Sequence, residues 1–234
     1  MTDTHPAAQP HGGIEEIFAD AFFVTGSVMF KPLVRLVRNM VILRDGEELT
    51  LVNAVRLNGE GEAALNALGK VKHVVRIGFH GMDDGYYVSR YQAKYWSVPG
   101  SSGPESDATL SEDGGLPVSN ARTFMFRDTV VPEAAILLER GGGLLITCDS
   151  IQHWAPHELL SPAARLITRL IGFQYPAQIG PPWRKKQTPP GGSLKSDFER
   201  LEALPFNHII GGHGGLLRDD AKPKLRETIE RVFG

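Results

Sequence analysis

The stretch Phe79-His80-Gly81-Met82-Asp83-Asp84-Gly85 follows directly on the apolar run Val74-Val75-Arg76-Ile77-Gly78. A short apolar run that is rich in β-branched residues predicts a buried strand, here over residues 71–77. A rigid sheet holds the residues at its strand ends in place, which suits metal ligands and catalytic groups. His80 and Asp84 are therefore candidate functional residues.

Two further apolar runs end in residues of the same kinds. Residues 144–147 lead into Cys148-Asp149, and residues 209–212 lead into His213. A metal hydrolase needs several nitrogen and oxygen ligands that converge from distant segments and leave one position open for water. The candidate metal ligands that meet this requirement are His80, Asp84, Asp149 and His213.

Each candidate ligand also has an ordinary structural interpretation. Asp84 could cap a helix expected over residues 84–96, and Asp149 could bond to the backbone of its turn. His213 lies between glycines and could bond loop carbonyls, and His80 could be a histidine at a loop edge. Three strand ends that carry His or Asp in this order favour a shared site over four separate structural roles.

The three motifs together resemble those of the metallo-β-lactamase superfamily, over roughly residues 14–234. Residues 80–85 are similar to the metal loop H-x-H-x-D-H, but Met82 and Gly85 stand where the family has its second and third His. The chain looks closest to a degenerate, uncharacterised branch of the family. The resemblance implies an α/β fold, a four-layer αββα sandwich of two mixed β-sheets flanked by helices, with the metal at one edge between the sheets.

The resemblance also implies roles for the candidate residues. His80 matches the first ligand of the first metal, and Asp84 matches the Asp that binds the second metal or orients the attacking water. Asp149 matches the Asp that bridges two metals, and His213 matches the last His. The family's middle His has no counterpart in residues 97–126. We therefore expect at most one divalent ion, Zn²⁺ first, with Fe²⁺ or Mn²⁺ as alternatives, and Asp84 as the catalytic base.

The composition is that of an ordinary globular protein. The 234 residues are 41% hydrophobic and 22% charged, with a formal net charge of -2. This balance gives no electrostatic case for a nucleic acid or a membrane surface as partner. We expect a disordered arm over residues 1–13 and a single domain over residues 14–234. No signal peptide is recognisable, and the lone Cys148 fits a reducing cytoplasm.

Periodicity and turn residues predict the other elements. A hairpin is expected over residues 40–55, turning at Asp45-Gly46, and a second over residues 134–147. Further expected elements are helices over residues 59–69, 157–171, 196–204 and 220–232, strands over 122–126 and 208–210, and a surface loop over 99–120. Residues 172–193 hold five prolines and four glycines, which predicts a long irregular excursion.

The excursion has two interpretations. It could close over a substrate, with Trp183 as an apolar face and Arg184, Lys185 and Lys186 facing an anionic group, or it could be a solvated loop. His153 and His157 could supply a replacement ligand or a proton shuttle, although we favour their being part of the N-terminal turn of the helix that follows. Cys148 is expected to be a buried, inert thiol, and Met82 a hydrophobic residue that fills a gap.

Three functions from different classes are compatible with these features. The first is a metallo-hydrolase-like protein that uses metal-activated water on a small ester, thioester, lactone or phosphoester. The second is a catalytically silent protein of the same fold that binds a small ligand or a partner. The third is an oligomeric scaffold, for example a homodimer. Four ligand-type residues at separate strand ends favour the first, because buried ionisable groups are costly to keep unpaired.

Overall fold

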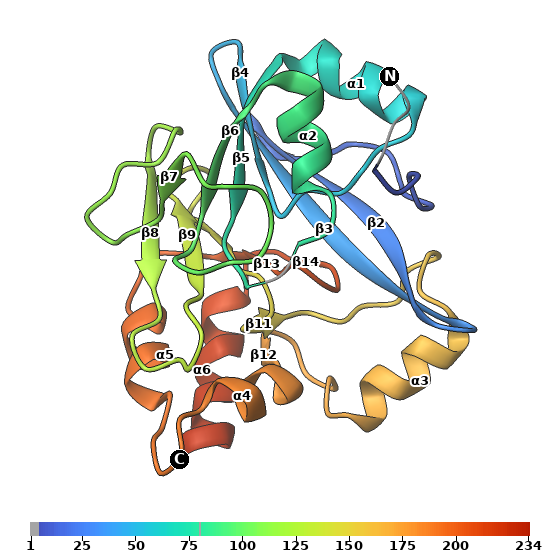
Figure 1. Cartoon of the computed structure of the whole chain (residues 1–234). Helices are drawn as coiled ribbons and strands as arrows, with labels where there is room; N and C mark the ends of the chain where they lie inside the picture. Colours follow the sequence, from blue (N-terminus) through green and yellow to red (C-terminus); the bar gives the residue numbers. More distant parts are fainter. Residues whose placement is uncertain (1–4, 80) are drawn as a thin grey trace.

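The computed structural model describes residues 5–79 and 81–234, and its centre is a pair of β-sheets packed face to face (Figure 1). The first sheet contains, in spatial order, β1 (Glu15–Phe18), β2 (Ala21–Lys31), β3 (Val34–Asp45), β4 (Glu48–Val52), β5 (Lys70–Arg76), β6 (Lys94–Ser97) and β7 (Ala108–Thr109). The second contains β14 (Leu216–Leu217), β13 (His208–Ile210), β10 (Leu144–Ile146), β9 (Ala134–Leu138) and β8 (Ala121–Met125). A small ribbon joins β11 (Ile151–Gln152) to β12 (Gln178–Ile179).

Both large sheets are mixed. Strands β1 to β4 pair antiparallel, and β4 to β7 pair parallel. In the second sheet, β10 pairs antiparallel with β9 and parallel with β13. The parallel pair β10–β13 matters for function, because the carboxyl ends of parallel neighbours meet at one edge of a sheet.

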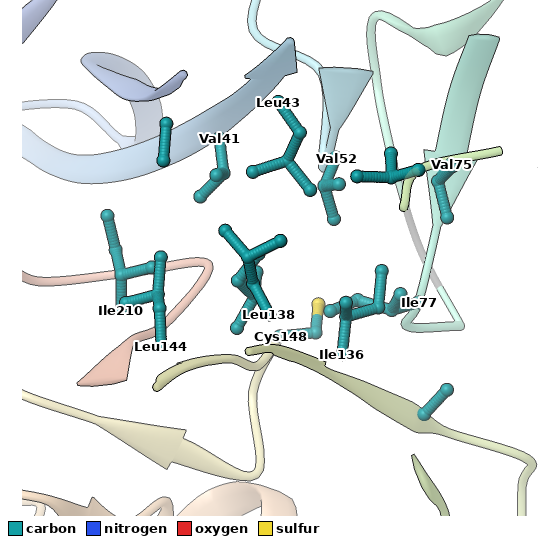
Figure 2. Close-up of a cluster of buried hydrophobic side chains, with 14 of the residues drawn as sticks. Val41, Leu43, Val52, Val75, Ile77, Ile136, Leu138, Leu144, Cys148 and Ile210 are labelled. Atoms are coloured by element: carbon teal, nitrogen blue, oxygen red, sulfur yellow. The ribbon is translucent and has the colours of Figure 1, made fainter. Parts of the chain in front are cut away.

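Alternating side chains of the strands form separate cores on the two faces of each sheet. Val41 and Leu43 of β3 face the second sheet, whereas Ile42 between them faces the helices outside the first. Figure 2 shows the core between the sheets, where side chains from β3, β4 and β5 approach those from β9, β10 and β13. This layer is fully apolar at its centre and fixes the distance between the two sheets.

The described residues form six helices, of which all but α3 cover the outer faces of the sheets: α1 (Gly59–Leu68), α2 (Asp84–Tyr91), α3 (Pro162–Leu170), α4 (Pro181–Gln187), α5 (Lys195–Glu202) and α6 (Ala221–Phe233). Leu65 of α1 and Tyr87 of α2 pack against the first sheet. Trp183 of α4, Phe198 of α5 and Leu225 of α6 pack against the second. The predicted four-layer αββα sandwich is thus confirmed, and α3 lies apart from it, against the extended end of the β2–β3 hairpin (Figure 1).

The structure corrects three of the predicted elements. The helix expected over residues 84–96 ends at Tyr91, because Gln92 adopts a left-handed conformation (φ 53°) and the chain continues as β6. The helix expected over residues 157–171 begins only at Pro162, since Ser161 caps it by accepting a hydrogen bond from the backbone N–H of Ala164. The excursion over residues 172–193 is not irregular throughout, for it contains β12 and α4.

The amino-terminal segment lies along the first sheet from residue 5 onward. Ser27 Oγ donates to the carbonyl of Pro10, and the backbone N–H of Asn58 donates to Nε2 of His11. The disordered arm over residues 1–13 and the single domain over residues 14–234 stay predictions. Within the part of the chain that the structure describes, no helix combines the length and the apolar character needed to cross a membrane.

Candidate active-site cleft

Two adjoining cavities open at the edge where the strands β5, β10 and β13 end. The first, of about 320 Å³, is here called the arginine cavity; its wall includes Arg38, Asn39, Arg76, Met82, Asp84 and Cys148. The second, of about 310 Å³, is called the apolar cavity; its wall includes Val34, Asp149, Ile167, Ile171, Phe173 and Trp183. Phe30, Leu36 and His213 line both cavities, so His213 stands at their junction.

His213 and Asp149 meet at the ends of the parallel strands β13 and β10. Nε2 of His213 lies 3.4 Å from Oδ1 of Asp149, and Nδ1 lies 2.8 Å from the carbonyl oxygen of Val37. The carbonyl can only accept, so Nδ1 carries a hydrogen, and Nε2, where it is unprotonated, presents its lone pair to the carboxylate. A lone pair that faces a carboxylate oxygen at this distance is stabilised when a proton or a metal ion lies between them.

The chemistry of this donor pair fits a metal ion. A tetrahedral ion with bonds of about 2.0–2.1 Å separates two of its ligand atoms by about 3.3–3.4 Å. The Nε2–Oδ1 distance of 3.4 Å equals that edge. The Nδ1–H bond to Val37 is the contact that orients a ligating histidine in metal sites. Over residues 5–79 and 81–234, no group of three or more His, Cys, Asp and Glu is placed to hold an ion.

The remaining predicted ligands are distributed as follows. His80 lies outside the described residues, so its place as the first ligand stays a prediction. Asp84 lines the arginine cavity together with His213, but its carboxylate has a partner from this chain. The structure thus brings Asp149 and His213 into contact and places Asp84 in the neighbouring cavity.

Asp84 forms an ion pair with Arg76, and both side chains are buried. Oδ2 of Asp84 accepts from Nε of Arg76 and lies 3.4 Å from the hydroxyl of Tyr95. Burial raises the pKa of Asp84, against the opposing effect of the Arg76 charge. Gly81 makes the pair possible, because a Cβ there would lie 2.6 Å from Nε of Arg76. The role of Asp84 as ligand and catalytic base stays a prediction.

A second ion pair lies beside the first. Arg38 of β3 donates to Asp83, which also accepts from the backbone N–H of Arg56 at 2.8 Å. Asp83, not Asp84, occupies the N-cap position of α2, which corrects the expectation that Asp84 caps this helix. Nε of Arg38, Nη1 of Arg76 and Oδ1 of Asp84 are buried without a hydrogen-bond partner in the described chain.

Glu133 is a further acidic group in the cleft that the sequence did not reveal. It precedes β9, is 2% exposed and lines the apolar cavity with Asp149 and His213. Its carboxylate accepts from Nε1 of Trp183 at 2.6 Å and from the backbone N–H of Ser150 at 3.0 Å. Burial first, and then the charge of Asp149, raise the pKa of Glu133 to about 8.

Several other predictions can be compared with the structure. Met82 is 56% exposed on the wall of the arginine cavity, so the expectation of a buried gap-filling side chain is wrong. Cys148 is buried, and burial raises the pKa of its thiol, as expected for an inert cysteine. Trp183 and Lys186 of the excursion line the apolar cavity, and closure of this segment over a substrate stays a prediction.

Comparison with known proteins gives structural matches only. No family model and no curated protein matches the sequence. The chain is similar to the DIM-1 metallo-β-lactamase exposed to ceftazidime, with a TM-score of 0.65 and 11% identity over 97% of this chain and 100% of that chain. It is also similar to a metallo-β-lactamase from Erythrobacter litoralis, with a TM-score of 0.63 and 11% identity over 94% and 92% of the two chains.

A third similar structure is a metal-bound form. The FIM-1 metallo-β-lactamase from Pseudomonas aeruginosa, in its mono-zinc form, matches with a TM-score of 0.63 and 12% identity over 97% of this chain and 98% of that chain. The three matches span nearly the whole of both chains in each case, which establishes a shared fold. Identities of 11–12% say nothing by themselves about activity.

Proposed function

We propose that this chain, which has the metallo-β-lactamase fold, is a metallo-hydrolase-like protein with one divalent ion, Zn²⁺ before Fe²⁺ or Mn²⁺. The observation that supports the proposal best is the 3.4 Å contact between Nε2 of His213 and Oδ1 of Asp149. These two side chains would hold the ion, with His80 as a third ligand. A cytoplasmic protein is part of the same proposal.

The bound ion would lower the pKa of a water molecule and polarise a carbonyl or phosphoryl oxygen. The chain itself supplies orientation and proton transfer. Val37 fixes the ring of His213 through Nδ1 at 2.8 Å. Asp84 is the candidate base, and the burial that raises its pKa makes its carboxylate a better proton acceptor.

Only one ion is proposed, because a cation of the chain already neutralises Asp84. The guanidinium of Arg76 contacts the carboxylate that the resemblance assigns to a second metal. Both partners are buried, and separating such a pair in a protein interior costs several kcal/mol, on the order of 3–5. The same cavity also contains Arg38, whose positive charge would repel a second ion.

Metal analysis of the untagged protein tests the proposal. The protein is purified without chelator or immobilised metal, and its metal content is compared with that of Asp149→Ala and His213→Ala. His157→Ala serves as control, because His157 lies on the wall of neither cavity. About one equivalent of Zn, Fe or Mn in the parent and control, lost in both cleft variants, supports the proposal. No metal in the parent after incubation with each ion contradicts it.

The alternative is a catalytically silent protein that binds a small ligand or a partner. The buried ion pair Arg76–Asp84 and the partly buried pair Arg38–Asp83 favour it, since they compensate charges that catalysis would otherwise use. A parent protein without metal, whose fold is unchanged in Asp149→Ala, would support this alternative. Hydrolysis of an ester, thioester, lactone or phosphoester that depends on added metal and disappears in His213→Ala would exclude it.

A further inference from the structure

Exposed apolar side chains gather around the mouth of the apolar cavity. Phe30 of the hairpin is 64% exposed, and Ile167 and Ile171 of the α3 region are 38% and 45% exposed. All three line the cavity, with Phe79 from the loop after β5. Apolar side chains that cluster in the open on a monomer commonly mark a binding surface, because their hydration is unfavourable.

The walls of this cavity are fixed to one another. Oγ of Ser161, the residue that caps α3, donates to the carbonyl of Leu33 at 2.9 Å. Nε of Arg35 donates to the carbonyl of Leu159 at 2.8 Å. Figure 1 shows α3 beside the tip of the β2–β3 hairpin. These bonds hold the hairpin and α3 together, so the cavity exists before a ligand enters it, which lowers the entropy cost of binding.

The polar groups of the cavity are concentrated in a few positions. Asp149 and His213 lie on its wall with Glu133, while the hairpin and α3 contribute chiefly apolar side chains. Lys186 is the one lysine or arginine among the described residues of the wall, and its Nζ lies 5.3 Å from the centre of the Phe79 ring. A phosphoester would need more positive charge than this wall offers.

We propose that the apolar cavity binds the hydrocarbon chain of an acyl ester or acyl thioester, with the carbonyl group beside Asp149 and His213. The inference rests on the proposed function for the reacting group, whereas binding of the hydrocarbon chain rests on the apolar side chains of the hairpin and α3 alone. In the reaction, the oxygen of water bonds to the acyl carbon and the bond to the alcohol or thiol breaks. The leaving oxygen or sulfur takes a proton, and the products are a carboxylic acid and an alcohol or thiol.

Straight-chain alcohols are suitable probes, because they carry the hydrocarbon chain without a charge that Asp149 would repel. Butanol to decanol are titrated into the protein and followed by tryptophan fluorescence, since Trp154 and Trp183 line the cavity. Each added CH₂ is expected to raise the affinity by up to about fourfold until the cavity is filled. An affinity that does not increase with chain length overturns the proposal.

Neighbouring residues at the carboxyl end of α3 supply matched variants. Ile171→Glu puts a charge on the cavity wall and is expected to weaken octanol binding at least tenfold. Leu170→Glu is the control, because Leu170 is 73% exposed and lies off the wall; its binding should stay within twofold of the parent. Equal binding by both variants overturns the proposal. If Ile171→Glu does not fold by circular dichroism, Ile167→Glu with control Leu166→Glu repeats the comparison.

Metal binding and binding of the hydrocarbon chain can be tested separately. Octanol binding should persist in the double variant Asp149→Ala/His213→Ala, since the hydrocarbon chain contacts the hairpin and α3. If the affinity for alcohols rises with chain length but the protein binds no metal, the result supports the apolar site and contradicts the hydrolase. If the protein binds one metal ion but its affinity for alcohols does not depend on chain length, the result supports the hydrolase and contradicts the apolar site.

Discussion

Nε2 of His213 lies 3.4 Å from Oδ1 of Asp149, and the far side of the same ring is fixed by the carbonyl of Val37 at 2.8 Å. The two residues are 64 positions apart in the sequence. They meet because β10 and β13 are parallel neighbours, so their carboxyl ends reach the same edge of the sheet.

Zn²⁺ should stabilise the parent protein and not Asp149→Asn. An ion that binds only the folded state stabilises it by about 2.7 kcal/mol at 100 times its dissociation constant. The asparagine keeps the shape of the side chain but removes the negative charge that the ion needs. Thermal unfolding with and without Zn²⁺ measures the difference, with His157→Ala as control. Equal stabilisation of the parent and Asp149→Asn would place the ion elsewhere on the protein.

Arg76→Met should destabilise the protein by about 3–5 kcal/mol, because it leaves the buried carboxylate of Asp84 without its cation. The double variant Arg76→Met/Asp84→Leu should regain at least half of that loss, since neither charge is then buried. Urea unfolding gives the free energies of unfolding. A single variant within 1 kcal/mol of the parent would show that water or another group compensates Asp84.

The sequence predicted correctly where the strands that carry Asp149 and His213 end. It predicted less well which other side chains surround those strand ends. The apolar runs before Asp149 and His213 are buried strands because every second side chain reaches the core between the sheets. Their parallel pairing could not be derived from one sequence, and the resemblance predicted only that the metal lies at one edge between two mixed sheets. Of the four candidate ligands, the sequence therefore predicted Asp149 and His213 best, because these two side chains are in contact in the structure.

Glu133 and Arg76 were not predicted to be part of the site, and the reason is physical. Each is a single charge beside or within an apolar run, and its partner comes from a distant or non-periodic segment: Trp183 for Glu133, and Asp84 for Arg76. The exposed face of α3 is a similar case. Leu166 and Leu170 fit the pattern of a helix packed on a core, but α3 presents both of them to solvent.

Gly78→Ala should destabilise the protein by about 1–3 kcal/mol, the usual cost of forcing extra volume into a packed core. Gly78 follows β5, and a Cβ there would overlap Sγ of Cys148 and lie 2.9 Å from its Cβ. The double variant Gly78→Ala/Cys148→Ala should regain part of the loss.

Gly59→Ala provides the control for that substitution. It lies at the start of α1, where a Cβ has no neighbour within 4 Å, so the change should be neutral or slightly stabilising. Thermal unfolding compares the variants. If Gly78→Ala and Gly59→Ala are equally stable, Gly78 and Cys148 lie further apart in the protein than in the structure.

Glu133 should make the stability of the protein fall as the pH rises from about 4.5 to about 8. Its pKa is raised from 4.5 to about 8 in the folded state, by burial first and then by the charge of Asp149. Below pH 4.5 both states hold the proton, and the stabilisation is complete. Between the two pKa values the folded state keeps a proton that the unfolded state releases, so stability decreases by up to about 1.4 kcal/mol per pH unit. Above pH 8 this contribution is constant.

Glu133→Gln removes the titrating group, so the decrease between pH 5 and pH 8 should be shallower than in the parent. Glu105→Gln, at an exposed acidic residue, is the control and should follow the parent. Urea unfolding at pH 5, 6, 7, 8 and 9 gives the curves, and only the difference between variants counts, because burial also raises the pKa of Asp84. Parallel curves for the parent and Glu133→Gln would mean that Glu133 is ionised inside the cavity. The hydrogen bonds from Trp183 and Ser150 would then outweigh the cost of its burial.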